Sequence, residues 1–158
     1  MNSTTDVLVQ RYQDNGNGTV TDLTTNLMWK KCSEGQVWDG QTCVGDVTEM
    51  TLDQAIWIPR TIFQKLLGVK QKSRVWPDFA GYNDWRLPTV DELHTILIEE
   101  VSMPCIDAEI FPNTPALWFW TMPPNIDLKH ARLVSFCGSY VDDSYKDKHH
   151  AVRLVRKI

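Results

Sequence analysis

The residues of this chain with the clearest potential for chemistry lie near its C-terminal end. His149 and His150 follow Asp147, and Asp143 stands a few residues earlier. Imidazole and carboxylate groups together suit several transition metals, so a metal-dependent hydrolytic enzyme is one interpretation. Adjacent side chains on a strand point to opposite faces, however, which weakens coordination of one ion by both histidines. We therefore expect no metal site and no catalysis here.

Other patterns that suggest chemistry have simpler explanations. The sequence contains no recognisable Ser-His-Asp arrangement and no glycine-rich phosphate motif, and Glu99-Glu100 is typical of surface charge at a helix end. The run from Asp14 to Gly18 suggests a calcium loop, but that pattern requires Asp or Asn where Gly16 and Gly18 stand. Glycine and Asx residues at this density predict a turn instead.

Four cysteines, Cys32, Cys43, Cys105 and Cys137, allow three disulfide pairings. Cys32 and Cys43 flank a glycine-containing loop that is typical of a stapled hairpin, which leaves Cys105–Cys137 as a longer closure. The metal alternative needs closely spaced ligands such as Cys-x-x-Cys, and the sequence has none. We therefore predict two disulfides, which indicate an oxidising compartment: secreted, periplasmic or at the cell surface.

Length and charge restrict the class of protein further. The 158 residues suit one domain over 1–158, with its core at about 7–157, and no repeat or linker divides them. The net charge of −4 argues against a nucleic-acid partner, although a local basic cluster near the end is diluted by aspartates. No stretch reaches the ~18 apolar residues of a membrane span, and the first residues lack the pattern of a signal peptide.

The segment best suited to position functional groups is residues 81–93. Gly81 tolerates the positive φ of a turn, and Pro88 disfavours helix immediately before it. Thr89 with Glu92 spells a capping box, in which each side chain satisfies a backbone N–H at a helix start. The segment therefore predicts a turn, a short extended stretch and the first turn of a helix.

Tryptophan is unusually frequent, with seven residues in the chain. Most of these large rings are expected in a small core, while one or two are candidates for a ligand surface. Trp85 and Leu87 alternate with Arg86, so we expect Trp85 to pack in the core. Arg86 is then expected to bind nearby backbone carbonyls or a carboxylate.

Helices and strands follow a clear order along the chain. Thr51 with Gln54 predicts a helix that Pro59 interrupts, with a restart through 62–67, and the capping box at Thr89 predicts another over 90–100. Alternation and turn signals predict strands at 7–12, 19–21, 27–29, 118–120, 131–140 and 151–155. Strands, two helices, a long proline-containing irregular region and further strands make an α+β arrangement.

Four blocks of the sequence together resemble the bacterial Lcl C-terminal-like domain, a family long catalogued as a domain of unknown function. They occur in the family's order and cover the chain from about residue 11 to 156: DNGNGTVTDLTTNLMWKKC, GYNDWRLPTVDEL, CIDAEIFPNTPALWFWT and AVRLVR. The resemblance implies a C-type lectin-like fold related to the formylglycine-generating enzyme scaffold. In that fold the N- and C-terminal strands pair, two helices flank small antiparallel sheets, and a long loop region presents the ligand surface.

The resemblance also implies a non-catalytic, exported bacterial module for adhesion or ligand binding, without a cofactor. Its partner is expected to be a glycan or protein on a cell surface. The module itself is a possible homo-oligomer. Ligands in this fold are usually bound by the late loops and the sheet face beside them. Here that implies a site formed by Trp118, Asn125, Tyr140, Asp142, Asp143, Tyr145, His149 and His150.

This sequence lacks motifs of related families, which argues against some kinds of ligand site and chemistry. Calcium-dependent lectins use a Glu-Pro-Asn or Gln-Pro-Asp triplet and a Trp-Asn-Asp triplet, whereas this chain has Asn83-Asp84-Trp85 and neither proline-centred triplet. Formylglycine-generating enzymes use two close cysteines near the C-terminus, and Cys137 has no such neighbour. A polyanionic glycan requires a basic surface, which a net acidic chain does not favour. The alternative function is a structural component of a surface, pilus or phage-derived assembly.

Overall fold

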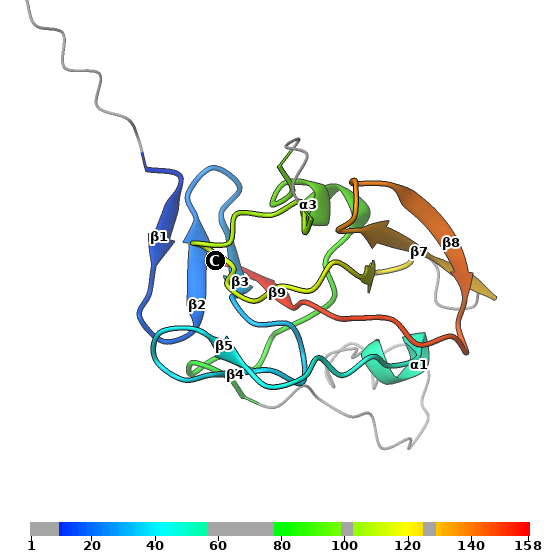
Figure 1. The fold of residues 1–158 in the computed structure, drawn as a ribbon, viewed down its shortest axis with the longest axis horizontal. Helices are drawn as coiled ribbons and strands as arrows, with labels where there is room; N and C mark the ends of the chain where they lie inside the picture. The colour runs from blue at the N-terminus through cyan, green and yellow to red at the C-terminus, as the bar shows by residue number, and fades with distance from the viewer. Residues whose placement is uncertain (1–9, 57–77, 99–102, 125–128) are drawn as a thin grey trace, which may run out of the picture.

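The computed structural model of this protein describes residues 10–56, 78–98, 103–124 and 129–158. These residues form small antiparallel sheets and two short helices, which confirms the α+β arrangement (Figure 1). None of the helices in these segments has the length and apolar character needed to cross a bilayer.

The first sheet joins the two ends of the described chain. Its strands run in the order β1-β2-β3-β9, all antiparallel: β1 Tyr12–Asp14, β2 Thr19–Asp22, β3 Leu27–Lys30 and β9 Val155–Lys157. Val20 pairs with Trp29, and Trp29 pairs with Val155. The last strand therefore closes the N-terminal meander through β3, and β1 lies at the sheet edge (Figure 1).

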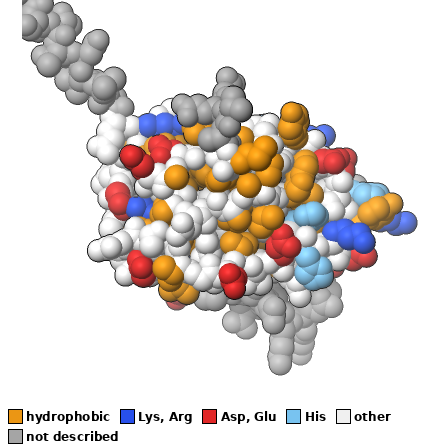
Figure 2. Space-filling model, in the orientation of Figure 1, with side chains coloured by type: hydrophobic (Ala, Val, Ile, Leu, Met, Phe, Trp, Pro, Cys, Tyr) orange, Lys and Arg blue, Asp and Glu red, His pale blue; other side chains and the backbone are white. Residues whose placement is uncertain are grey.

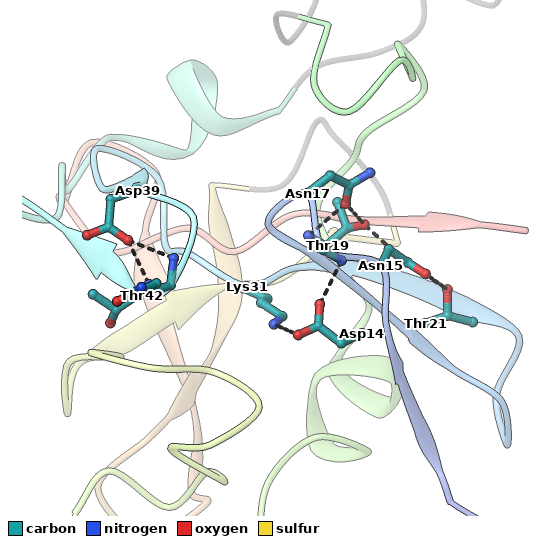
Figure 3. A network of polar contacts seen from close by, with 10 residues as sticks. Asp14, Asn15, Asn17, Thr19, Thr21, Lys31, Asp39 and Thr42 are labelled. Atoms are coloured by element: carbon teal, nitrogen blue, oxygen red, sulfur yellow. Dashed lines mark hydrogen bonds and ion pairs between the residues drawn. The ribbon is translucent and has the colours of Figure 1, made fainter.

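The predicted turn between β1 and β2 is confirmed, and its side chains form a polar network (Figure 3). The Asp14 carboxylate accepts the Gly16 N–H at 2.9 Å and lies 2.5 Å from the Lys31 ammonium group. The Asn17 side chain accepts the Thr19 N–H and hydroxyl at 3.2 and 2.6 Å. The Asp14 carboxylate therefore stabilises the turn and forms an ion pair with Lys31.

The second sheet is a hairpin of β4 Val37–Trp38 and β5 Cys43–Val44. A disulfide joins Cys32 to Cys43, as predicted. The predicted Cys105–Cys137 disulfide is wrong, because no bond joins these two residues. The Cys137 thiol instead lies 2.9 Å from the Ala116 carbonyl oxygen, while the backbone N–H of Cys105 donates to Phe136 at 2.9 Å.

Removing the Cys32–Cys43 bond is expected to lower the free energy of unfolding. The two residues are 11 positions apart, and a closed loop of that size restricts the unfolded chain by about 3 kcal/mol. Urea denaturation of a Cys32→Ser/Cys43→Ser double variant measures this loss. Reductant should destabilise the wild type and leave the double variant unchanged; equal midpoints for the two proteins would contradict the expectation.

The third sheet has the order β6-β7-β8, with β6 Trp118–Trp120, β7 His130–Ser135 and β8 Val141–Tyr145. The strand predicted over 131–140 is wrong in extent, because the chain reverses at Gly138 and Ser139, which have φ of +133° and +62°. β7 therefore ends before this turn, and β8 returns beside it as an unpredicted strand.

The remaining strand predictions agree in part with the structure. Strands predicted at 19–21, 27–29 and 118–120 are confirmed. The strand predicted over 151–155 begins later, as β9, because Ala151 pairs with the β6 residue Phe119 in an isolated bridge. The strand predicted over 7–12 lies mainly outside the described residues, and β1 begins at Tyr12.

Both predicted capping boxes are present at the starts of the two helices. α1 Leu52–Ala55 begins after Thr51, whose side chain and that of Gln54 satisfy each other's backbone N–H groups. α3 Val90–His94 begins in the same way with Thr89 and Glu92. α3 is shorter than the predicted 90–100, ending before Thr95, and the restart predicted over 62–67 lies outside the described residues.

Two hydrophobic clusters pack against opposite faces of the third sheet. Phe119 and Val134 belong to the first cluster, with Trp29 and Leu93, while Trp120 and Leu133 belong to the second. Since side chains alternate along a strand, the sheet separates the two clusters. On the Val134 side of the sheet, the side chains of His130 and Arg132 at the start of β7 are exposed, whereas Ala131 and Leu133 on the other side are buried.

Candidate ligand-binding cleft

A cleft of about 750 Å³ lies between the start of α3, the segment after β6 and the outer end of the β7–β8 hairpin. Clefts of this volume accommodate small ligands. Figure 2 shows histidine, basic and acidic side chains close together at the β7–β8 end of the molecule. We call the cleft the α3–β7 cleft. Its lining residues are Thr89–Asp91, Thr121–Pro124, Lys129–Arg132 and Asp143.

Backbone hydrogen bonds fix the walls of the cleft relative to one another. The Met122 N–H donates to the Pro88 carbonyl at 2.7 Å, which joins the segment after β6 to the start of α3. The buried Thr121 hydroxyl donates to the Arg132 carbonyl at 2.9 Å, which joins the same segment to β7. The cleft is therefore formed by elements in direct contact.

The α3 wall is held by an ion pair that the sequence indicated only in part. Both Arg86 Nη atoms lie 2.7 Å from the two Glu92 carboxylate oxygens, and Arg86 also donates to the Leu87 carbonyl at 3.0 Å. Glu92 additionally accepts the Thr89 N–H at 2.9 Å. The expectation that Arg86 binds carbonyls or a carboxylate is confirmed, and the pair fixes the helix start beside Asp91.

This ion pair predicts a loss of stability in acid. Burial alone would raise the pKa of Glu92, but hydrogen bonds from Arg86 and Thr89 outweigh it, so the folded-state pKa is lowered. A carboxyl with a lowered pKa stabilises the fold above its unfolded value, near 4.3, and loses that contribution as the pH falls further. The contribution of Glu92 to the free energy of unfolding should therefore stay level from pH 7 to 5 and fall below about pH 4.5.

A Glu92→Gln variant tests the assignment. It should be about 2 kcal/mol less stable than the wild type at pH 7, the scale of a charged hydrogen bond. The difference should shrink as the pH falls to 3, because the wild-type carboxyl is then protonated. Urea titrations at both pH values measure it, and a constant difference would show that Glu92 acts only through packing.

One face of the β7–β8 hairpin carries four exposed side chains that face the cleft or its rim. His130 pairs with Tyr145 and Arg132 with Asp143, so these pairs share a face and follow each other along the hairpin. The His130 and Tyr145 rings are 4.2 Å apart, tilted by 47°. Arg132 Nε lies 4.0 Å from Asp143 Oδ1.

Three of the predicted site residues lie away from this face. Trp118 lies on the opposite side of the sheet, packed against the second hydrophobic cluster. His150 is half-buried there: its Nε2 is 2.9 Å from the Ser144 hydroxyl, its ring meets Trp120 edge-on at 4.7 Å, and burial lowers its pKa. The Asp142 side chain also lies on the opposite side of the sheet, because Asp142 pairs with Leu133, and its carboxylate accepts the Asp143 N–H at 2.8 Å.

The other predicted site residues divide between the cleft, its surroundings and the undescribed part of the chain. Asp143 lines the cleft and Tyr145 lies beside it. Tyr140 and His149 are exposed, before and after β8. Asn125 lies outside the described residues. Within the segments that the structure describes, no three His, Cys, Asp or Glu side chains are arranged to hold a metal ion.

Sequence reasoning missed Lys129 just before β7, His130 and Arg132 on β7, and Asp91 on α3, all of which line the cleft. A signal for the strand residues was present. In β7, exposed His130 and Arg132 alternate with buried Ala131 and Leu133. This period of two predicts one polar face, but only the position of the hairpin turn shows which residues of β8 lie opposite.

The protein defined by these features is a small, disulfide-bonded α+β domain with a charged cleft at the end of its third sheet. The sequence model of the Lcl C-terminal domain matches residues 18–156. The chain therefore belongs to the Lcl C-terminal domain family, which confirms the resemblance of the four sequence blocks. No curated protein sequence matches the chain.

Proposed function

We propose that this chain is a non-catalytic binding module of an exported bacterial protein, with a C-type lectin-like scaffold. Its ligand is a cell-surface glycan or protein, bound in the α3–β7 cleft. The pairing of β9 with β3 and the two capped helices support the scaffold assignment. The Cys32–Cys43 disulfide supports export, because such bonds persist mainly in oxidising compartments.

The observation that carries the binding proposal is the exposure of four polar or aromatic side chains on one face of the β7–β8 hairpin, those of His130, Arg132, Asp143 and Tyr145. Tyr145 is 58% exposed, and the Arg132 and Asp143 side chains are 64% and 66% exposed. An ion pair this exposed adds little to folding stability. A ring, a cation and a carboxylate that the core does not use are available to bind a ligand.

A binding screen tests this proposal. Labelled protein is applied to arrayed glycans and to bacterial and host cell surfaces, beside an Arg132→Ala/Asp143→Ala double variant. The double variant should lose most of the binding while keeping the wild-type melting temperature. An Asp46→Ala variant is the matched control, because this exposed carboxylate lies outside the cleft. Equal binding by all three proteins would contradict a site in the cleft.

A further inference from the structure

We infer that the α3–β7 cleft takes an uncharged sugar ring, bound by the His130–Tyr145 ring pair and the Arg132–Asp143 pair without a metal ion. This inference rests on the proposed binding function and names its ligand class. The two pairs are neighbours on one face of the hairpin, with opposite chemical character.

The His130–Tyr145 pair supplies an apolar platform. The rings lie 4.2 Å apart and contact each other, and both side chains are exposed, so the sides of the rings that do not contact each other are available beside the cleft. Neither residue belongs to either hydrophobic cluster. An aromatic ring joins a large apolar face to a polar tip, which suits a sugar, since a sugar ring has an apolar C–H face and a polar rim.

The Arg132–Asp143 pair supplies the polar contacts. Its 4.0 Å separation is longer than a hydrogen bond, so the guanidinium retains N–H donors and the carboxylate retains acceptor sites. The pair lies two residues from the platform, roughly 7 Å along the strand. A ring stacked on the platform can therefore place neighbouring hydroxyl groups against a donor and an acceptor at once.

Charge and size favour an uncharged sugar over other ligands. Of the lining residues that the structure describes, Lys129 and Arg132 are balanced by Asp91 and Asp143. A sulfated or phosphorylated polymer would require an excess of cations. A protein partner would require an interface burying roughly 1,200–2,000 Å², whereas a cleft of about 750 Å³ encloses a ligand of one or a few rings.

Titration of ¹⁵N-labelled protein with methyl pyranosides and neutral trisaccharides tests the inference, with a heparin hexasaccharide as the polyanion. Neutral sugars should shift the amide signals of β7 and β8, with less than about a twofold change in Kd between 50 and 500 mM NaCl or on adding EDTA. Tyr145→Ala and Asp143→Asn should each weaken binding about tenfold or more. Tyr82→Ala removes an exposed tyrosine outside the cleft and should leave binding unchanged.

The possible failures separate the two proposals. If heparin or a cell-surface protein shifts the cleft amides and no neutral sugar does, the sugar assignment is wrong and the binding function stands. If neutral sugars bind but EDTA or Tyr82→Ala abolishes binding, the contacts assigned here are wrong. If ligands that bind the domain leave the cleft amides unmoved, both proposals are wrong.

Discussion

Trp85→Ala should lower the free energy of unfolding by about 3–5 kcal/mol, as truncation of large buried rings does. Trp85 is 2% exposed and belongs to the second hydrophobic cluster. Its indole N–H donates to the Phe79 carbonyl at 3.1 Å, and the Lys30 ammonium group lies 5.7 Å from its ring. The variant would lose packing, a hydrogen bond and a cation–π contact together.

Thermal and urea denaturation measure this loss, and binding is measured below the melting temperature of the variant. Tyr82→Ala is the matched control, because Tyr82 lies in the same segment but is exposed. Its ring contacts Arg156, with the guanidinium 3.8 Å from the ring centre, so the expected loss is only about 0.5–1 kcal/mol. A Trp85→Ala protein that kept its melting temperature and lost its ligand would place Trp85 in the binding site.

The second large effect is expected at Arg153, whose side chain is completely buried. It donates to the carbonyls of Lys30 and Lys31 and to the hydroxyls of Ser33 and Thr114, with the Thr114 contact at 2.7 Å. Burial lowers its pKa to about 9, so the group stays charged at pH 7. Arg153→Ala would leave these buried acceptors unsatisfied, at a cost of about 4 kcal/mol.

Arg153→Lys separates the roles of charge and geometry. Lysine keeps the charge but cannot reproduce the planar, branched donor group, so we expect a loss of about 2 kcal/mol. Arg153→Met keeps much of the volume and removes both the charge and the donors. Urea midpoints of the three variants should all fall below the wild type. If Arg153→Met matched the wild type, the hydrogen bonds of Arg153 would have no net stabilising effect.

Features set by residues close in sequence were predictable. Each capping box joins residues three positions apart, such as Thr89 and Glu92, so their types and spacing contain the necessary information. The turn after Asp14 was predicted for the same reason, because its glycines and Asx residues determine the local backbone. Even the carboxylate partner expected for Arg86 is only six residues away.

Features set by distant residues were not predictable in the same way. Arg153 binds a carbonyl 123 residues earlier in the chain, and nothing local in the sequence indicates that acceptor. The β7 residues of the cleft, His130 and Arg132, were missed because the pairing of Arg132 with Asp143 depends on where the hairpin turns. The Cys105–Cys137 disulfide was predicted only because these two cysteines remained once Cys32 and Cys43 were paired. That reasoning contains no information on where the two thiols lie in the fold.

The central claim is that the α3–β7 cleft is the ligand site, and amide chemical-shift mapping with a ligand found by the binding screen tests it most directly. We predict shifts concentrated in Thr89–Asp91, in Thr121 and Met122, and in the β7–β8 hairpin, and their loss in the Arg132→Ala/Asp143→Ala variant. Shifts confined to the turn after Asp14 or to the β4–β5 hairpin, unchanged in that variant, would contradict the claim.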